Sequence, residues 1–506
     1  MKKFFFILLG LCIFLCRGML SQTVSLEMAQ QVAENFFLSQ TPFLSTISIE
    51  SHPFGNREQP TMYAFSSSDS WVLISGDKRA QPILAYSDEH GSGFPAEEDM
   101  PDVMLYFLEW YNEQIDSMRK ENSYRIPNPQ WEEYLNANHR STANRSVIVT
   151  PLLIRDGNQN TWRQKGNNSG NDITKSYNKF CPSMHDPNGT YCEHSMVGCV
   201  ALATAQVMWY WQWPYAAIVQ NAQQCRYYDW SLMPYRLTNS SSLQQADMTA
   251  HLLYDVAESV NMLYLCQESY AEPSTAADSL RGVFSYNASN IKERRHYINS
   301  TWINMIKNEL NEHRPILYGG ESYTYGKHFF VIDGYDSDNK FHANFGMDYL
   351  ISNGYFTLDA IYFNDSQLMI TNITPNYPSC SPTTIPSTDV WPTHFLIQNG
   401  GGITIGNRTV TSGMQGVILS GEYVKLNSGF KVNAGADVYI AIKDMHCDDD
   451  RGDILEPIEY VPEIHHTPQR QSIIEASPSA TKLLRAGQVL IERNGHTYTI
   501  TGAEIR

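Results

Sequence analysis

Hydrophobic residues in the first quarter of the chain recur first with helical spacing and then with strand spacing. Apolar side chains lie three or four residues apart in residues 26–37 and again in 103–118, which predicts two amphipathic helices. Between them, the apolar run 71–75 ends at a turn formed by Gly76 and Asp77, which is typical of a buried strand. Residues 123–145 are polar and contain two prolines, and we interpret them as a linker open to proteolysis after Arg140 or Arg145.

The pattern changes to short β runs near the C-terminus. The apolar runs 403–405, 417–419, 423–426 and 438–442 are separated by Gly and Asn residues, which predicts a small β-module, or a solenoid, over residues 391–445. Residues 446–480 are polar and contain prolines, so we expect a second linker. The tail, residues 481–506, predicts a hairpin that turns at Asn494 and Gly495, and its style is similar to that of C-terminal sorting segments.

The first 21 residues have the layout of a secretory signal peptide. Lys2 and Lys3 precede an apolar run over residues 4–16, and small residues follow it. A membrane anchor is the alternative, but Arg17 interrupts the run. No later apolar stretch reaches transmembrane length, so we expect a soluble mature protein that is secreted or held at the cell surface.

Composition and net charge exclude some classes of protein and of partner. Hydrophobic residues make up 42% of the 506 positions, enough for packed cores, and the length predicts about three domains. Charged residues account for only 18%, which argues against a coiled coil. The formal net charge of −17 repels phosphate backbones, so we do not expect nucleic acid to be a partner.

Nine cysteines are present, and the predicted signal peptide removes two of them. The odd remainder indicates at least one unpaired thiol in the exported protein. Three disulfides with one free cysteine, or no disulfide at all, are both compatible with the count. No Cys-x-x-Cys occurs, so zinc chemistry has little support and neither a metal nor a cofactor is expected.

The first candidate for chemistry is Cys199. Residues 198–211 are rich in Ala, Leu, Gln and Met, which favours a helix that Pro214 would end. Cys199 follows Gly198 at the start of this helix, where the helix dipole is expected to stabilise a thiolate and lower the pKa of the thiol. The alternative is a small buried cysteine in a core helix, the usual fate of a lone cysteine.

A thiolate nucleophile requires a base, and His328 is the candidate. It starts the apolar run 328–332, and a turn at 336–339 leads into a strand that carries Asn344. A turn centred near Asp336 would place Asn344 opposite His328, and a later centre would shift the pairing by a few residues. The amide would then orient the imidazole, as in Cys-His-Asn acyl transfer. His342 is the nearest competing histidine, although it does not start a strand.

Gln164 is the third candidate. A side-chain amide there could donate a hydrogen bond to a developing oxyanion together with the backbone N–H of Cys199. A surface glutamine is the alternative, and composition alone would not select this residue.

Several separated segments together resemble the streptopain family of bacterial cysteine proteases, a papain-like group also found in Bacteroidetes. The motifs are Trp162-x-Gln164, Tyr177-Asn178-x-x-Cys181-Pro182, the run 198–206 from Gly198 to Gln206, the run 328–335 from His328 to Tyr335, and Asn353-Gly-Tyr-Phe356. The resemblance spans residues 24–376. It implies an α+β fold, with a papain-like catalytic domain of two subdomains over residues 146–376 and an α+β propeptide domain over residues 22–145.

The resemblance also implies roles for single residues: Cys199 as nucleophile, His328 as general base and acid, Gln164 as oxyanion donor and Asn344 as the residue that orients the imidazole. The sequence departs from the family motif after Asn344. Phe345 stands where the family has the Trp that shields the imidazole, and after Gly346 the residues Met347, Asp348 and Tyr349 stand in place of its Trp-Gly-Gly. Lys327 replaces the more usual Gly before the histidine. We expect Phe345 and Lys327 to alter the substrate groove.

The predicted function is therefore a secreted cysteine endopeptidase that is made as a zymogen. Its partners would be protein or peptide substrates and its own propeptide, acting as an inhibitor. Two alternatives stay open. The same Cys-His pair could transfer an acyl group to an amine, and a degenerate homologue could act as an adhesin or decoy.

Overall fold

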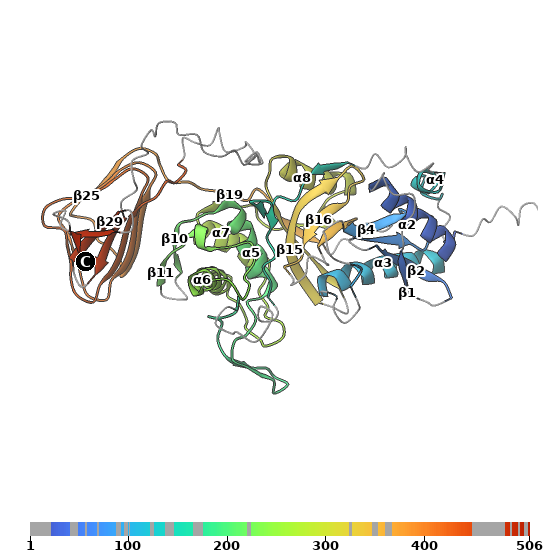
Figure 1. The fold of residues 1–506 in the computed structure, drawn as a ribbon, viewed down its shortest axis with the longest axis horizontal. Coiled ribbons are helices and arrows are strands. Elements are labelled where there is room, and N and C mark those ends of the chain that lie inside the picture. The colour runs from blue at the N-terminus through green and yellow to red at the C-terminus, as the bar shows by residue number, and fades with distance from the viewer. Residues whose placement is uncertain are drawn as a thin grey trace, which may run out of the picture.

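One large antiparallel sheet runs through the N-terminal and central parts of the chain (Figure 1). The computed structural model describes residues 22–40, 49–55, 58–67, 70–87, 93–95, 100, 102–121, 126–136, 146–164, 176–219, 224–322, 326–346, 353–359 and 367–447, together with the strands between 481 and 505. The predicted signal peptide and most of the predicted linker 446–480 lie outside the described residues.

The N-terminal part is a four-stranded antiparallel sheet with a helix on each face. Its elements are α2 (Leu26–Gln40), β1 (Glu50–Gly55), β2 (Pro60–Ser66), β3 (Trp71–Ser75), β4 (Ile83–Ser87), α3 (Asp102–Lys120) and α4 (Gln130–Asn136). Alternate residues of a strand point to opposite faces. Val72 and Ile74 therefore pack with α2, whereas Trp71 and Leu73 pack with α3. The two predicted helices and the predicted strand are confirmed.

The polar stretch that we interpreted as a linker contains the short helix α4, so that interpretation is wrong for residues 130–136. Trp131 is buried, and its indole N–H donates a hydrogen bond of 2.9 Å to the carbonyl of Ala80. Asn35 of α2 donates to the carbonyl of Tyr134. Two aromatic anchors are thus enough to fold this stretch onto α2, although its seven residues carry little helical periodicity. Residues 137–145, with both arginines, lie outside the described residues.

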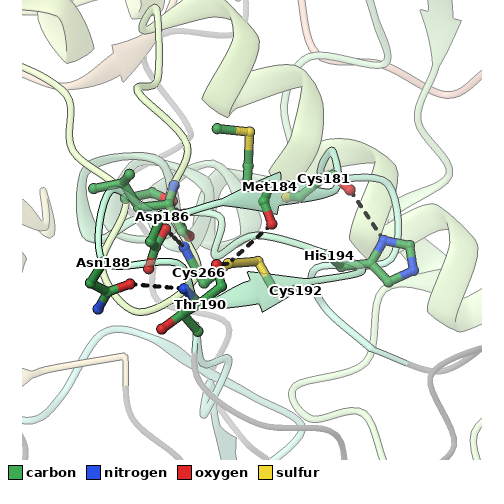
Figure 2. Close-up of a disulfide and its surroundings, with 10 residues drawn as sticks. Cys181, Met184, Asp186, Asn188, Thr190, Cys192, His194 and Cys266 are labelled. Atoms are coloured by element: carbon green, nitrogen blue, oxygen red, sulfur yellow. Dashed lines mark hydrogen bonds between the residues drawn. A yellow bond between two sulfur atoms is a disulfide. The ribbon is translucent and has the colours of Figure 1, made fainter.

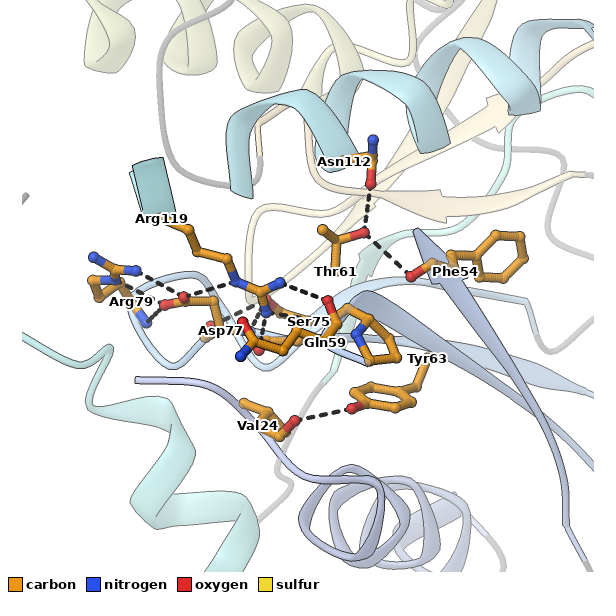
Figure 3. Close-up of polar contacts among 12 residues, drawn as sticks. Val24, Phe54, Gln59, Thr61, Tyr63, Ser75, Asp77, Arg79, Asn112 and Arg119 are labelled. Atoms are coloured by element: carbon orange, nitrogen blue, oxygen red, sulfur yellow. Dashed lines mark hydrogen bonds and ion pairs between the residues drawn. The ribbon is translucent and has the colours of Figure 1, made fainter. Parts of the chain in front are cut away.

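A buried charge cluster fixes the end of α3 to the sheet (Figure 3). The carboxylate of Asp77, at the predicted turn after β3, is fully buried and accepts hydrogen bonds of 2.9 and 2.8 Å from the guanidinium of Arg79. Arg119, in the last turn of α3, donates to the carbonyls of Pro60 and Gly76. The sheet and α3 are therefore joined by polar contacts as well as by the apolar core.

The sheet continues from the N-terminal part into the central part without a break. Its further strands are β5 (Val147–Val149), β13 (Lys292–Glu293), β14 (Ile316–Ser322), β15 (Gly326–Asp336), β16 (Phe341–Asn344), β17 (Gly354–Phe356) and β18 (Leu368–Ile370). Strand β4 pairs antiparallel with β17, placing Tyr86 opposite Tyr355 and Ala85 opposite Phe356. No sequence pattern indicated this junction between two parts of the chain.

Helices form the other half of the central part. They are α5 (Cys199–Trp211), α6 (Leu243–Ser259), α7 (Ser274–Gly282) and α8 (Asn299–Asn311), with the short strands β6 (Ile154–Arg155), β7 (Asn158–Gln159), β8 (Met184–His185), β9 (Tyr191–Cys192), β10 (Ala216–Val219), β11 (Gln224–Tyr227), β12 (Tyr286–Asn287) and β19 (Thr374–Pro375). Helix α5 is buried over residues 200–209 and packs against α6 and β15. A helical subdomain thus meets a sheet subdomain, which confirms the predicted α+β fold class.

The C-terminal β-module is a parallel solenoid. Its strands are β20 (Thr383–Ile385), β21 (His394–Asn399), β22 (Ile403–Ile405), β23 (Thr409–Val410), β24 (Gln415–Ser420), β25 (Val424–Leu426), β26 (Lys431–Val432) and β27 (Asp437–Ile442). The stacked partners His394, Gln415 and Asp437 begin successive coils. The antiparallel strands β28 (Thr481–Arg485), β29 (Gln488–Arg493), β30 (His496–Thr499) and β31 (Glu504–Ile505) extend its sheet, and the β29–β30 pair confirms the predicted hairpin.

The solenoid docks on the helical subdomain through the β10–β11 hairpin (Figure 1). The rings of Tyr227 and Tyr439 stack with centroids 4.5 Å apart, and Val417 and Leu419 pack into the same apolar cluster. The thiol of Cys225 donates a hydrogen bond to the carbonyl of Phe395. The module is therefore packed against the central part, not merely tethered to it.

Two disulfides are present among the described residues. They join Cys192 to Cys266 and Cys380 to Cys447, while Cys181, Cys199 and Cys225 are free thiols. The prediction of at least one unpaired thiol is thus confirmed, and the pairing is neither of the two alternatives that the count suggested. None of the helices in the described part of the chain combines the length and the apolar character needed to cross a membrane.

Candidate active site

Cys199 is the first residue of α5, as the sequence predicts. Gly198 precedes it with a φ of +83°, a left-handed conformation that favours glycine. A side chain at this position would also collide with Met262, since an added Cβ would lie 2.6 Å from the sulfur of that residue. Gly198 therefore lets the chain turn sharply against the loop 262–274 and start the helix at Cys199.

His328 is the third residue of β15, next to the helix that carries Cys199. It is 5% exposed and lies opposite Gly320 of β14. A side chain at Gly320 would overlap with Tyr106 of α3, so this helix of the N-terminal part reaches the strand pair that holds His328. The N-terminal part therefore contributes to the surroundings of His328.

Cys199 and His328 line one cavity of about 410 Å³. Apolar side chains of Val200, Ala271, Pro273, Ile291 and Leu368 form part of its lining, with Glu272, Glu293, Arg295, Glu321 and Lys327 as charged members. The structure therefore brings Cys199 together with Lys327 and His328, which follow it by more than a hundred residues in the chain.

Burial raises the pKa of the Cys199 thiol to about 11. The backbone N–H of Phe329 opposes this rise by hydrogen bonding to the sulfur, whereas the charge of Glu268 adds to it. The expected lowering of the pKa by the helix dipole is therefore wrong for this state of the protein. The residue is partly exposed, but atoms packed around the sulfur remove water that a thiolate would need, and this cost exceeds the gain from the helix N-terminus.

A disulfide anchors the loop that forms one wall of the cavity (Figure 2). Cys266 is bonded to Cys192 of β9, and its backbone N–H donates a hydrogen bond of 2.8 Å to the carboxylate of Asp186. Leu263 and Tyr270 pair across the loop, which then supplies Tyr270 and Ala271 to the lining. Sequence reasoning missed this loop, because the cysteine count could not assign partners.

Gln164 lies at the end of an irregular segment beside α5, outside the cavity lining. Its backbone carbonyl accepts a hydrogen bond of 2.9 Å from the amide of Asn178, and the same amide accepts one of 3.1 Å from the backbone N–H of Val197. Gln164 is partly buried. The structure thus holds its backbone close to the turn that precedes Cys199.

Asn344 is fully buried but lies opposite Val331, not opposite His328. The turn between β15 and β16 falls at residues 337–340, and a register shift between Ile332 and Gly334 adds to the offset. The Asn344 amide donates to the carbonyl of Asn160, and its oxygen accepts from Gln206. The structure therefore joins this amide to α5 and to residue 160, and these polar partners were missed from the sequence.

Phe345 packs into an aromatic cluster instead of lining the cavity. Its ring lies 5.3 Å from that of Phe330, 5.2 Å from that of Phe356 and 6.1 Å from that of Phe107 in α3. One of these ring partners, Phe107, belongs to the N-terminal part of the chain. Residues 347–349, the other departures from the family motif, lie outside the described residues.

The competing histidine, His342, is buried in a separate polar pair. Its Nδ1 lies 2.6 Å from the carboxylate of Asp333, and both side chains are at most 1% exposed. The backbone N–H of Leu153 donates to the other carboxylate oxygen of Asp333. Neither His342 nor Asp333 is part of the cavity lining, and the geometry favours His328 as the histidine of the site.

The chain is similar in sequence to known proteins. Residues 172–356 match the family model described as the Peptidase C10 family, and residues 21–115 match the model of the Spi protease inhibitor. Streptopain from Streptococcus pyogenes is 29% identical over 330 residues, which cover 61% of this chain and 76% of that protein. The thiol protease/hemagglutinin PrtT of Porphyromonas gingivalis is 27% identical over 386 residues, which cover 71% of this chain and 41% of that protein.

Two solved structures from Prevotella intermedia are also similar. Prointerpain A, as a fragment, aligns with a TM-score of 0.47 and 22% identity over 64% of this chain and 98% of that chain. Active interpain A aligns with a TM-score of 0.35 and 24% identity over 45% of this chain and 94% of that chain.

The matched peptidase family and a cavity lined by one cysteine and one histidine define a cysteine peptidase. The chain is a cysteine peptidase that resembles streptopain, and a domain similar to the Spi protease inhibitor precedes the part that matches the peptidase model. The resemblance inferred from the sequence motifs is thereby confirmed.

Proposed function

We propose that the protein is a secreted endopeptidase that is made as a zymogen and hydrolyses peptide bonds through Cys199 and His328. The observation that carries this proposal is the single cavity that both residues line. The apolar run that follows Lys2 and Lys3 supports export. Proteins or peptides would be the substrates.

In the proposed mechanism, His328 takes the proton of Cys199, and the thiolate attacks the carbonyl carbon of the scissile bond. The amide of Gln164 and the backbone N–H of Cys199 donate hydrogen bonds to the oxyanion of the tetrahedral intermediate. His328 then protonates the leaving amine, and a thioester remains on Cys199. Water activated by His328 hydrolyses this thioester and restores the thiol.

Asn344 would act on His328 only indirectly, since its amide binds Asn160 and Gln206. We propose that it holds the end of β16 near His328. Asn344 lies opposite Val331, and His328 precedes Val331 by three positions on β15. Lys327 would shape the groove, because it lines the cavity beside His328. Phe345 would act indirectly, through its packing on Phe330 of the strand that carries His328.

The propeptide would keep the enzyme latent until cleavage after Arg140 or Arg145. Two observations support latency. The N-terminal sheet is continuous with the catalytic sheet through β4 and β17, and Tyr106 of α3 lies against Gly320, the residue opposite His328. In this state the pKa of Cys199 is about 11, so the thiol is protonated at neutral pH. Removal of the N-terminal part would free the sheet to readjust and allow the Cys-His pair to form.

The experiment is hydrolysis of casein and of a labelled peptide by the purified full-length protein, beside Cys199→Ala and His328→Ala. We expect the parent to shorten and then to cleave, and both variants to stay at full length without activity. A parent no more active than Cys199→Ala would refute the proposal. Adding a primary amine tests the acyl-transfer alternative, since a labelled amide product would appear in place of the free acid.

A further inference from the structure

One side chain joins the backbone of Gln164 to the turn that precedes Cys199. Asn178 is 8% exposed and uses both ends of its amide. Its Nδ2 donates to the carbonyl of Gln164 at 2.9 Å, and its Oδ1 accepts from the N–H of Val197 at 3.1 Å. Val197 is two residues before the nucleophile. The distance between the Gln164 backbone and the start of α5 therefore depends on this amide.

A second amide joins the other end of the same segment to α5. Gln206 lies seven residues after Cys199, two helical turns later on the same face of the helix. Its Nε2 donates to Oδ1 of Asn160 and to Oδ1 of Asn344, each at 3.1 Å. Oδ1 of Asn160 also accepts from the N–H of Trp162, which sets the direction of the chain towards Gln164.

Stability alone does not explain the buried amide cluster of Asn160, Gln206 and Asn344. Nδ2 of Asn160 and Oε1 of Gln206 are buried and have no hydrogen-bond partner among the described residues. A partly satisfied polar cluster in a core is less stable than an apolar one of the same shape. The amides are therefore better explained by the geometry that they impose on the site.

We propose that Asn178 and Gln206 are positioning residues that clamp residues 160–164 to helix α5 from both ends and so fix the oxyanion donor Gln164 relative to Cys199. This inference rests on the proposed function. Stabilisation of an oxyanion requires donors at hydrogen-bond distance from the place where the charge develops, so a small displacement of residues 160–164 reduces the rate of the chemical step. Substrate binding in the cavity would change little, because neither Asn178 nor Gln206 lines it.

A double-mutant cycle tests the clamp. Asn178→Asp keeps the size of the side chain and the acceptor for Val197 but removes the donor to Gln164. We expect kcat to fall roughly tenfold to a hundredfold, with KM changed by less than about twofold. In a Gln164→Ala background the same change should lower kcat by less than about twofold, because no side-chain amide remains to be misplaced.

Thr204→Val is the matched control. Thr204 is buried on the same helix, but its hydroxyl donates only to the carbonyl of Val200 within α5. Its kcat should stay within about twofold of the parent. An equal loss on Asn178→Asp in the two backgrounds would mean a purely structural role and would overturn the inference.

Should Asn178→Asp fail to fold, Gln206→Glu enters the same cycle, since a carboxylate cannot donate to Asn160 and Asn344. Its activity relative to the parent should rise as the pH falls, because a protonated carboxyl regains one donor. A flat ratio across pH would also overturn the inference. Cys199→Ala in the same assay separates a failure of the proposed function from a failure of the clamp. A parent no more active than Cys199→Ala refutes the proposed function itself, whereas an active parent with an additive cycle refutes only the clamp.

Discussion

Tyr86 donates a hydrogen bond of 3.0 Å to a carboxylate oxygen of Asp336, although 250 residues separate them in the chain. The ring of Tyr86 also stacks on that of Tyr355, its partner across the β4–β17 junction, with centroids 4.9 Å apart. The other oxygen of Asp336 accepts from the N–H groups of Asp338 and Lys340 in the turn after β15. The propeptide is thus bonded to the strand that carries His328.

The first prediction concerns this bond. Tyr86→Phe keeps the stacked ring but leaves the buried Asp336 with one partner fewer, which should lower the free energy of unfolding of the precursor by about 1–3 kcal/mol. Hydrogen–deuterium exchange should rise in β17, where the junction opens. The control is Tyr63→Phe, because the Tyr63 hydroxyl donates to Val24 within the propeptide. Equal exchange in β17 for both variants would contradict the role of the junction.

The second prediction follows from the raised pKa of Cys199. At a pKa of about 11, the thiolate fraction in the precursor grows with pH through the whole neutral and mildly basic range. The rate of alkylation by iodoacetamide should therefore rise about tenfold per pH unit without levelling off near the pKa of an ordinary thiol. Mass-spectrometric mapping of labelled Cys199 checks this. A plateau near neutral pH in the uncleaved precursor would show that the thiolate is already formed.

The third prediction uses Asp255 of α6, which is fully buried beneath β11. Arg226 and Tyr228 both donate to its Oδ2, yet burial dominates and raises the pKa from 3.8 to about 6. Between these two values the folded protein keeps a proton that the unfolded chain has lost, so the contribution of Asp255 to stability falls as the pH rises through this window.

Asp255→Asn does not titrate, and its stability relative to the parent should therefore increase from about pH 4 to pH 6 and stay constant above that range. Urea unfolding at a series of pH values measures the difference. Asp247→Asn, on the same helix, is the control, because Asp247 is 42% exposed in its ion pair with Lys179. A relative stability that is flat across the window for Asp255→Asn would rule out the raised pKa.

Local patterns in the sequence were enough to predict the elements that carry the site. The abundance of Ala, Leu, Gln and Met after Gly198 predicted α5, and the apolar run at His328 predicted β15. The repeated β runs with Gly and Asn predicted the solenoid, since each coil repeats the same local signal. The family motifs supplied the pairing of Cys199 with His328, which no local pattern could provide.

What could not be predicted depends on contacts between distant segments. The register that places Asn344 opposite Val331 depends on a turn and a register shift that the alternation of residues does not reveal. The pKa of Cys199 depends on atoms packed around it, so reasoning from the helix dipole alone had the wrong sign. Helix α4 is stabilised by contacts of Trp131 with Ala80, not by its own periodicity.

The fourth prediction compares the two disulfides. Cys192–Cys266 and Cys380–Cys447 close segments of similar length, with sequence separations of 74 and 67. Chain-entropy arguments therefore assign to each a stabilisation of roughly 4 kcal/mol. Their positions differ, because Cys266 anchors the loop that supplies Tyr270 and Ala271 to the cavity.

Replacing Cys380 and Cys447 together with Ser should lower the midpoint of thermal unfolding of the β-module and leave kcat/KM nearly unchanged. The module would stay docked, since the ring of Tyr439 still stacks on Tyr227 of the β10–β11 hairpin. Replacing Cys192 and Cys266 should cost similar stability but also lower kcat/KM, because the wall of the cavity loses its anchor. Calorimetry and peptide hydrolysis on both double variants decide the matter. Equal activity of the two would mean that the loop holds its shape without the disulfide, through the pairing of Leu263 with Tyr270.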